Sequence, residues 1–462
     1  MTRITPILAA FLLLMATPAV AQPGGSNGQV QYNNAGAFGG LTDPQLTART
    51  QQFINVRAHG ALGNSNGTAG NGNDDTTAIQ SAFNAAGQTV GGGTYKSIYF
   101  PCGTYRITAT VTGNASNTTY QVFGDGNCSQ IFLDANTGTA ALSFTSPSTS
   151  CGGNNSLPPC VSIDKLYFPT PTTPANSVAI AFIANPASVV SNSTFVAYGK
   201  ALTYTNSYSP RVVGNTFLRM RGSALECLDV SCNNAIIWRN QFFANGLVTG
   251  ELAVTIGNSA ANCESAPNNI SIHGNDLSYN FGAILFRGAC AVSIDSNYFE
   301  QNTDHFIYAN AGVNQAFNVR GNWISLNGNA ASGAVTIDGF TGLTFDSNTF
   351  YNQTINFGTS TRVGYAGYNA IRGSSTLQQF CGAAQNCSYG QNGKMDMWGF
   401  GTVSATPTAF TYPVACQTNI TGAVIASLDN GVNMYITALT NTQITVVATV
   451  TPTTVSWRVT CS

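Results

Sequence analysis

The hexapeptide Ile294-Asp295-Ser296-Asn297-Tyr298-Phe299 recurs along this chain at a nearly regular spacing. Each copy reads as an apolar residue, a variable residue, a small or polar residue, Asn, a variable residue and an aromatic or aliphatic residue. From Asn215 to Asn348, the steps between the Asn residues are 25, 35, 22, 25 and 26 residues. A period of this size is typical of stacked coils, so the pattern predicts a solenoid of parallel β-strands. The copies begin at Val190, Val212, Ile237, Ile272, Ile294, Val319 and Phe345.

The Asn of each copy is expected to lie in a turn, where Asn tolerates left-handed backbone and can pair with the Asn of the next coil. Ser193 replaces this Asn in the first copy. The longer step from Asn240 to Asn275 holds an insertion at about 258–268, which bears Cys263. A loop of this kind carries function or shapes a groove.

A second pattern covers Ile54 to about Thr108. Ile54-Asn55-Val56-Arg57-Ala58-His59-Gly60-Ala61 reads as a short strand that ends in Gly-Ala. Asn73-Asp74-Asp75-Thr76-Thr77-Ala78-Ile79-Gln80 ends a loop and begins a helix of about Thr76 to Ala86. Asp75 is the expected N-cap, because its side chain can accept hydrogen bonds from the first free amides. The next strand, Ser97-Ile98-Tyr99-Phe100, runs through Pro101 into Gly103-Thr104-Tyr105.

This series resembles the amino-terminal end of the pectate lyase superfamily, which includes rhamnogalacturonase-like, epimerase-like and tail-spike-like proteins. The resemblance implies an all-β fold, a single-stranded right-handed parallel β-helix whose open end is capped by the N-terminal helix. It identifies no reaction, because members of such a superfamily share a scaffold more than a chemistry. The acid and base arrays of polygalacturonases and the calcium-site and arginine patterns of pectate lyases are not recognisable here, so no catalytic residue is transferred.

The chain opens with Arg3, an apolar run from Ile7 to Met15 and Ala19-Val20-Ala21, which together predict a secretory signal over residues 1–21. Residues 22–52 are expected to form an extended lead-in, residues 53–390 the β-helix and residues 395–462 a small C-terminal β domain. The lead-in resembles short modules of phage tail proteins. The ending near Trp457 resembles distal domains of phage tail fibres, which implies that the protein could form a homotrimer.

Twelve cysteines follow the signal and predict a disulfide framework. We therefore expect a secreted protein, extracellular or periplasmic. No later stretch is apolar for long enough to cross a bilayer, so no membrane anchor is expected after signal cleavage. The neighbouring cysteines suggest the pairs Cys102 with Cys128, Cys151 with Cys160, Cys227 with Cys232, Cys263 with Cys290, Cys381 with Cys387 and Cys416 with Cys461.

The composition disfavours nucleic acid and favours sugars as a partner. Only 8% of the residues are charged, the net charge is −1, and Lys and Arg total 17. Nucleic acid phosphates require a basic surface, whereas amides and hydroxyls can hydrogen bond the hydroxyls of an extracellular polysaccharide. No cofactor is expected; calcium could bind, but no site for it is recognised.

The residue two places before each repeat Asn forms the first candidate site. Because these positions recur once per coil, they should stack as an outward column of mostly ionisable groups, about 4.8 Å apart. Such a column could hold a sugar chain, or it could be a ladder of solvated surface ion pairs. Its members are Trp238, His273, Asp295, Arg320 and Asp346.

A second recurring strand gathers the other candidates, Glu226, Asp229, Glu251, Arg287, Asp304, His305 and Asp338. Hydrolysis needs two carboxyl groups, roughly 5 Å apart for retention or 6.5 to 9.5 Å for inversion. Glu226 with Asp229 or Glu251 are the first choices. Alternatively, Glu226 or Asp229 holds the turn closed by Cys232.

Elimination would instead need a base and a cation that neutralises a uronate carboxylate. His305 could be the base, and Arg287 or Arg320 the cation. Substrate binding is assigned to Arg287, Asp304, Arg320, Asp338, His273 and Asp295, and sugars could stack on Tyr279, Tyr298, Trp323 and Tyr351.

These residues predict a polysaccharide-degrading enzyme, a glycoside hydrolase or a polysaccharide lyase, with a groove along the β-helix. The alternative is a non-catalytic carbohydrate-binding surface protein or a tail-spike-like protein.

Overall fold

The structure is a computed structural model. It describes residues 30–34, 37–41, 53–87, 96–115, 119–135, 139–146, 160–228, 232–247, 251–257, 259, 262–303, 305–309, 312–325, 334–337 and 339–351, followed by separate strands between 354 and 461. The chain divides into two compact units, residues 1–54 and 55–462. In the first unit, β1 (Val30–Asn34) and β2 (Ala37–Leu41) form an antiparallel hairpin within the region expected as a lead-in.

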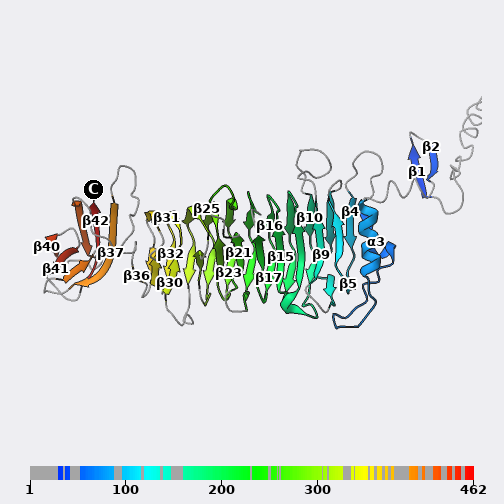
Figure 1. Ribbon diagram of the computed structural model, residues 1–462, viewed down its shortest axis with the longest axis horizontal. Coiled ribbons are helices and arrows are strands. Elements are labelled where there is room, and N and C mark those ends of the chain that lie inside the picture. Colours follow the sequence, from blue (N-terminus) through cyan, green and yellow to red (C-terminus); the bar gives the residue numbers. More distant parts are fainter. Residues whose placement is uncertain are drawn as a thin grey trace, which may run out of the picture. The chain divides into compact units, whose positions relative to one another are not determined.

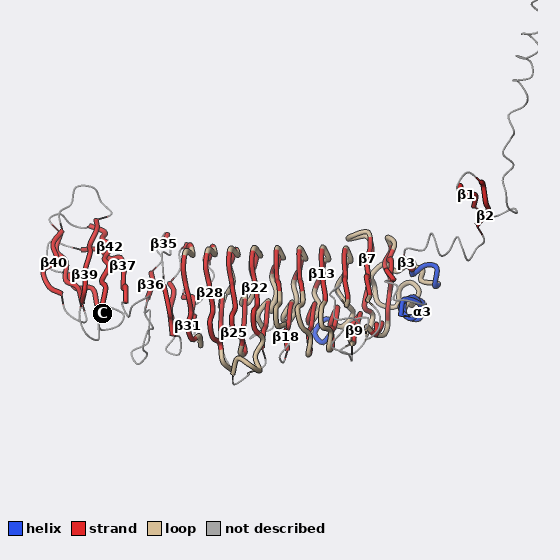
Figure 2. The backbone as a smooth tube through the Cα atoms, turned by 90° about the horizontal axis from the view of Figure 1, so that it is seen from above, coloured by secondary structure: helices blue, strands red, loops and turns tan. Residues whose placement is uncertain are grey.

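The described strands of the repeat region form three long parallel sheets, and Figures 1 and 2 show them stacked coil upon coil. From β4 to β27, each coil contributes one strand to each sheet in turn. The parallel β-helix is therefore confirmed, while its right-handed sense stays a prediction. Sheet 1 contains β3 (Phe53–Asn55), β4 (Lys96–Phe100), β7 (Tyr120–Gly124), β10 (Val161–Asp164), β13 (Ser188–Ser191), β16 (Arg211–Val213), β19 (Ile236–Trp238), β22 (Asn268–His273), β25 (Ala289–Asp295), β28 (Asn314–Arg320), β31 (Thr341–Asp346) and β34 (Arg362–Ala366).

Sheet 2 follows the Asn turn, and sheet 3 precedes the return to sheet 1. A further parallel sheet contains β30 (Ala334–Ile337), β33 (Thr354–Phe357) and β36 (Thr376–Gln378). Sheet 2 contains β5 (Gly103–Ile107), β8 (Ser129–Leu133), β11 (Tyr167–Phe168), β14 (Thr194–Val196), β17 (Thr216–Leu218), β20 (Gln241–Phe243), β23 (Asp276–Ser278), β26 (Tyr298–Glu300), β29 (Trp323–Ser325), β32 (Thr349–Tyr351) and β35 (Ala370–Arg372). Sheet 3 contains β6 (Val111–Asn114), β9 (Ala140–Thr145), β12 (Val178–Ile183), β15 (Lys200–Thr205), β18 (Leu225–Leu228), β21 (Val254–Gly257), β24 (Ile284–Arg287) and β27 (Ile307–Ala309).

The core of the solenoid consists of apolar residues that repeat once per coil. Phe195, Phe217 and Phe242 occupy the same register position in sheet 2 and are fully buried. Their rings stack with centroids 5.2 Å and 4.8 Å apart. Burial of each such side chain contributes roughly 1.5 to 3 kcal/mol, so this column alone is a strong source of stability.

The Asn of the repeat forms a continuous buried ladder, which confirms the predicted pairing. Asn240 shows the pattern: its Nδ2 donates to Val212 O at 2.8 Å and to Asn275 Oδ1 at 3.0 Å, and its Oδ1 accepts from Asn215 N at 2.9 Å. The left-handed backbone, however, belongs to the residue before the Asn, as at Arg239 with φ 53°. The Asn is therefore selected for its hydrogen bonds rather than for left-handed backbone. The members are Asn215, Asn240, Asn275, Asn297, Asn322 and Asn348.

A second Asn ladder, which the sequence pattern did not predict, lies at the turn between sheets 2 and 3. Asn245, Asn280 and Asn302 are buried. Each accepts a hydrogen bond from the previous coil, as from Asn245 Nδ2 to Asn280 Oδ1 at 3.0 Å. Both corners that flank sheet 2 thus satisfy buried backbone groups with side-chain amides.

Helix α3 (Thr76–Gly87) covers the first coil (Figure 1), which confirms the predicted cap. The Gln80 side chain replaces a missing neighbouring strand at the edge of sheet 3. Its Nε2 donates to Thr112 O at 2.9 Å, and its Oε1 accepts from Thr112 N at 2.8 Å. The buried face of the helix consists of Ile79, Ala82, Phe83 and Ala86.

The side chain of Asp75 does not cap helix α3, so this detail of the prediction is wrong. Its Oδ1 and Oδ2 accept hydrogen bonds from Leu62 N at 2.7 Å and from Gly63 N at 3.0 Å. Burial raises the pKa of Asp75. The neighbouring Asp74 instead accepts from Thr76 N at 3.0 Å, so the two aspartates divide loop closure and helix initiation between them.

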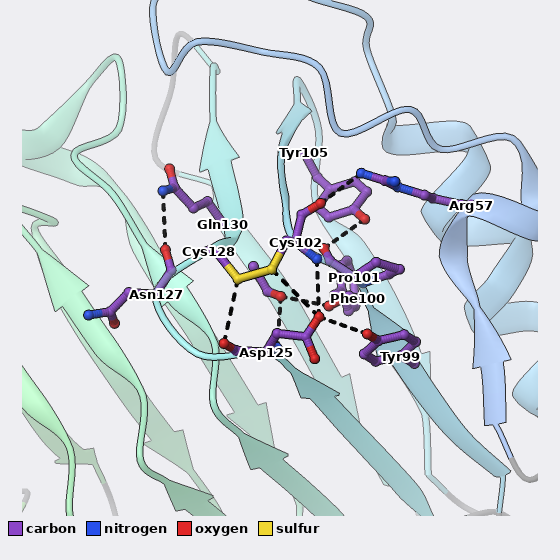
Figure 3. The surroundings of a disulfide bond; sticks show 11 residues. Arg57, Tyr99, Phe100, Pro101, Cys102, Tyr105, Asp125, Asn127, Cys128 and Gln130 are labelled. Atoms are coloured by element: carbon purple, nitrogen blue, oxygen red, sulfur yellow. Dashed lines mark hydrogen bonds between the residues drawn. A yellow bond between two sulfur atoms is a disulfide. The ribbon is translucent and has the colours of Figure 1, made fainter.

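Three predicted disulfides are confirmed, Cys102 with Cys128, Cys227 with Cys232 and Cys263 with Cys290. The first joins the sheet 1 to sheet 2 turns of two consecutive coils (Figure 3). Beside it, the Asp125 carboxylate accepts from Tyr99 Oη at 2.7 Å (Figure 3). Disulfides of this kind fit an oxidising, extracytoplasmic compartment. The other three pairs include residues outside the described part, Cys151, Cys381, Cys387 and Cys416.

An ion pair on the outer surface joins the first two coils. Arg106 Nε lies 2.5 Å from Asp134 Oδ2. Asp134 also accepts from Gly70 N at 2.8 Å and from Thr172 Oγ1 at 2.5 Å. Burial by itself would raise the pKa of Asp134, but these hydrogen bonds and the Arg106 charge together lower it below the usual 3.8.

Beyond the solenoid, the described strands form two antiparallel sheets. One contains β37 (Met395–Val403), β42 (Thr453–Cys461) and β39 (Ile420–Ser427), and the other contains β38 (Thr408–Thr411), β41 (Gln443–Ala448) and β40 (Met434–Leu439). A separate C-terminal domain stays a prediction. The predicted signal lies outside the described residues, and within them we find no helix with the length and apolarity needed to span a membrane.

We expect Asn240→Ala to lower the free energy of unfolding by about 2 to 4 kcal/mol, because it leaves buried groups on the two neighbouring coils unpaired. Chemical denaturation of the purified protein measures this loss. Gln241→Ala, an exposed neighbour on the same coil, is the control and should change the value little. Equal losses in both variants would contradict a stabilising role for the ladder.

The lowered pKa of Asp134 predicts a pH dependence of stability. The native contacts of its carboxylate stabilise the fold fully above about pH 4, and this stabilisation is lost as pH falls through the lowered native pKa. Asp134→Asn should therefore destabilise the protein at pH 7 and have a smaller effect at pH 3. Urea unfolding at both pH values tests this, with the exposed Glu264→Gln as control. An effect of the same size at pH 3 and pH 7 contradicts the assignment.

Candidate functional site

The outer face of sheet 3 carries a compact polar cluster around Glu226. Strand register places Thr203, Glu226 and Thr255 in one outward column on β15, β18 and β21. Glu226 is nevertheless only 5% exposed. Its Oε2 lies 2.5 Å from the Nζ of Lys200, whose side chain remains 35% exposed. The ammonium thus compensates for the burial of this carboxylate.

The second carboxylate of the cluster is Glu251, just before β21. Its Oε2 accepts a hydrogen bond from Ser223 Oγ at 3.1 Å. Ser223 Oγ also lies 2.8 Å from Thr255 Oγ1, and Thr255 is the register neighbour of Glu226. The Ser223 hydroxyl therefore links the Glu251 carboxylate to the hydroxyl of Thr255, which is the neighbour of Glu226 on the next coil. We call Lys200, Ser223, Glu226, Glu251 and Thr255 the sheet 3 cluster.

Gly246 controls where Glu251 lies. Its φ is +70°, and a Cβ at this position would lie 2.1 Å from Glu251 O. Only glycine combines this left-handed backbone with so close an approach. Gly222 also lies beside the cluster: a Cβ there would lie 2.8 Å from Gly199 O and in ordinary contact, at 3.8 Å, with Glu251 Oε2.

Arg287, His305 and Tyr308 lie on or directly beside sheet 3, on later coils than Glu226. Arg287 ends β24 and is partly exposed, in register with Gly257. His305 precedes β27, and its ring stacks on Tyr308 with centroids 4.2 Å apart. The sequence pattern thus assigned Glu226, Glu251, Arg287 and His305 to one sheet. Asp229, Asp304 and Asp338 lie outside the described residues.

The outward column predicted from the repeat is confirmed on sheet 1. Register aligns Trp238, His273, Asp295, Arg320 and Asp346 on consecutive coils. The His273 ring stacks on Trp238 at 5.5 Å. No ion pair joins these charges in the described part of the chain, although they alternate along the column.

The predicted substrate-binding residues consequently lie on two different sheets. His273, Asp295 and Arg320 belong to sheet 1, whereas Arg287 belongs to sheet 3. Among the described residues, no side-chain contact joins Arg287 to the three residues on sheet 1. A catalytic arrangement is therefore best sought in the sheet 3 cluster alone.

One group of described residues has the spacing of metal ligands, Cys102, Asp125 and Cys128. The two sulfur atoms are bonded to each other, as Figure 3 shows, so they are not thiolate ligands. This donor set therefore does not fit a metal.

Sequence reasoning missed Lys200, Ser223 and Thr255. Lys200 precedes Glu226 by 26 residues, which is one coil period, and such a spacing between opposite charges could have suggested the ion pair. Ser223 and Thr255 carry no comparable signal, because hydroxyl residues are common throughout this chain. Their link to Glu251 depends on the close approach of Gly246 to Glu251.

No protein-family model and no curated protein matches the sequence. Among solved structures, the chain is similar to the A-module of the mannuronan C-5 epimerase AlgE6 of Azotobacter vinelandii, with 16% identity, coverage of 71% of this chain and 97% of that chain, and a TM-score of 0.48. It is also similar to DFA-IIIase of Arthrobacter chlorophenolicus A6, with 13% identity, coverage of 72% and 96%, and a TM-score of 0.47. A third similar structure is the Dettilon tailspike protein, with 13% identity, coverage of 91% and 96%, and a TM-score of 0.40.

Gly246→Ala should destabilise the protein by more than the roughly 1 kcal/mol that left-handed backbone costs an alanine, because the new Cβ collides with Glu251 O. Gly67→Ala is a matched control, since Gly67 has φ +77° and open space around it. Thermal unfolding of both variants separates backbone strain from collision. If both melt at the same temperature, Gly246 does not position Glu251 as described.

Proposed function

We propose that the protein cleaves extracellular polysaccharide on the outer face of sheet 3, with Glu226 and Glu251 as the catalytic carboxyl groups. The observation that carries this proposal is the sheet 3 cluster itself. Only 8% of the residues of the chain are charged, yet two carboxylates and one ammonium group meet there on successive coils. A second carboxylate beside an ion pair that is already closed adds nothing to that pair, and this supports a functional role for Glu251.

The different surroundings of the two carboxylates suit two different roles. Glu251 is only partly buried and accepts from Ser223, so it can exchange a proton with a leaving group or with water. Glu226 is held by Lys200, which leaves its other oxygen as the base or nucleophile. Glu226 and Glu251 lie on neighbouring coils but are offset along the chain, because the register partner of Glu226 is Thr255. Such an offset favours the wider separation of roughly 6.5 to 9.5 Å that inverting glycosidases use over the roughly 5 Å of retaining ones.

Elimination from a uronate is the second chemistry that sheet 3 supports. His305 would take the proton, with its ring held against Tyr308, and Arg287 would neutralise the substrate carboxylate. Both side chains are partly exposed on the same sheet. Asp229, Asp304 and Asp338 remain proposed participants, and His273, Asp295 and Arg320 remain proposed sugar contacts on sheet 1.

The alternative function is binding without cleavage, as in a carbohydrate-binding surface protein or a tail-spike-like protein. The burial of Glu226 favours it, because an ion pair closed by Lys200 can simply hold β15 against β18. In either function the secreted location and a homotrimer remain part of the proposal. Disulfides that link neighbouring coils support the former.

Incubation of the purified protein with a panel of polysaccharides tests the proposal. New reducing ends without unsaturated sugar indicate hydrolysis, and absorbance of an unsaturated uronate indicates elimination. For hydrolysis, Glu226→Gln and Glu251→Gln should each lower kcat at least about 100-fold, because each removes a proton-transfer group or a nucleophile. If the reaction is elimination, His305→Ala should instead be the variant that lowers kcat at least about 100-fold, because it removes the base.

Asp164→Asn, a carboxyl-to-amide change on the outer face of sheet 1, is the matched control and should keep full activity. Binding of a polysaccharide without any product supports the alternative function. Full activity in folded Glu226→Gln and Glu251→Gln variants rules out hydrolysis by the sheet 3 cluster.

A further inference from the structure

The outer face of sheet 2 carries a row of aromatic side chains between β20 and β32. Tyr279 is 45% exposed, Tyr298 38% and Tyr351 39%, and they are the exposed tyrosines of the described part of the chain. Trp323 stacks against Tyr351 with centroids 6.4 Å apart and planes 17° apart. Burial of such rings is normally favourable, so an exposed row of them points to a ligand.

Tyr279 lies in the turn that directly follows β23. Its φ is 60°, in the left-handed region that aromatic residues rarely adopt. The equivalent residues of the other coils, Ala197, Arg219, Ala244 and Gln301, have the same backbone conformation, and none of them is aromatic. The fold therefore needs no ring at this position. The Tyr279 ring packs on Phe243 with centroids 5.0 Å apart, yet it stays 45% exposed, so its outer face is free to contact a ligand.

Two carboxylates, those of Asp276 and Glu300, lie beside the aromatic rings on sheet 2. Register aligns Asp276, Tyr298 and Trp323 in one outward column on β23, β26 and β29. Glu300 lies in the neighbouring outward column. In that column, Ser325 is its neighbour on the next coil, and Tyr351 is the neighbour of Ser325 on the coil after that. Burial and the negative charge of Glu300 raise the pKa of Tyr298, as expected for a phenol held beside this carboxylate.

We propose that Asp276, Tyr279, Tyr298, Glu300, Trp323 and Tyr351 form a binding strip for an uncharged glycan chain, separate from the catalytic face on sheet 3. The rings would stack on the apolar faces of the sugars, and the carboxylates would accept hydrogen bonds from their hydroxyls. Neighbouring coils are about 4.8 Å apart, so rings on successive coils can contact a single extended chain.

The charge of the strip selects the class of glycan. In the described outward columns of β20, β23, β26, β29 and β32, Asp276 and Glu300 are acidic, and no side chain is basic. A polyuronate would bring its carboxylates against Asp276 and Glu300, and that repulsion disfavours binding. An uncharged chain meets no such penalty.

A glycan array that contains uncharged, amine-bearing and uronate-bearing sugars, probed with the full-length protein, is the first test. An uncharged glycan should bind. Affinity electrophoresis in the corresponding polysaccharide should then show that Tyr298→Ala and Trp323→Ala each weaken binding about tenfold or more. Tyr298→Phe, which keeps the ring, should bind nearly as well as the wild type.

Tyr167→Ala is the matched control, because Tyr167 lies on the outer face of the same sheet but several coils away. Asp164→Asn, a change on the outer face of sheet 1, should also bind normally. The proposal is overturned if no uncharged glycan binds, if a polyuronate binds better, or if both folded variants, Tyr298→Ala and Trp323→Ala, bind like the wild type.

Discussion

Every coil of this solenoid must turn its backbone at buried corners, and the hydrogen bonds lost there must be replaced. The Asn amides do this in the described coils from Asn215 to Asn322, where each side chain pairs with a backbone carbonyl and with the Asn of the next coil. An unpaired buried amide costs roughly 1 to 3 kcal/mol, so a shifted register would be strongly disfavoured. The ladders therefore fix which residues become vertical neighbours.

This fixed register converts scattered residues of the sequence into continuous surfaces. Lys200 and Glu226 meet because their strands are adjacent in sheet 3, although they are 26 residues apart. The same stacking builds the column from Trp238 to Asp346 on sheet 1 and aligns Tyr298 with Trp323 on sheet 2. Each outer face thus has its own chemical character, while the apolar interior stays the same from coil to coil.

The sequence predicted those features that carry a local or a periodic signal. The outward column on sheet 1 and the Asn pairing follow from the repeat. The three disulfides follow from the spacing of neighbouring cysteines, and the helical cap follows from the resemblance of residues 54–108 to the pectate lyase superfamily. The role of Asp75 could not be predicted in this way, because either Asp74 or Asp75 can accept from a helix amide. The contacts of Glu251 depend on the close approach of Gly246, and periodicity contains no information about such a local path.

The contact between Gln80 and Thr112 has a consequence for solubility. A parallel sheet that ends in an open edge is a template for another chain, and stacked solenoids could grow into fibres by this route. Here the side-chain amide of Gln80 occupies both the donor and the acceptor of Thr112. The first coil is thereby closed to a further strand at that residue, so the cap protects the protein against end-to-end polymerisation as well as covering its core.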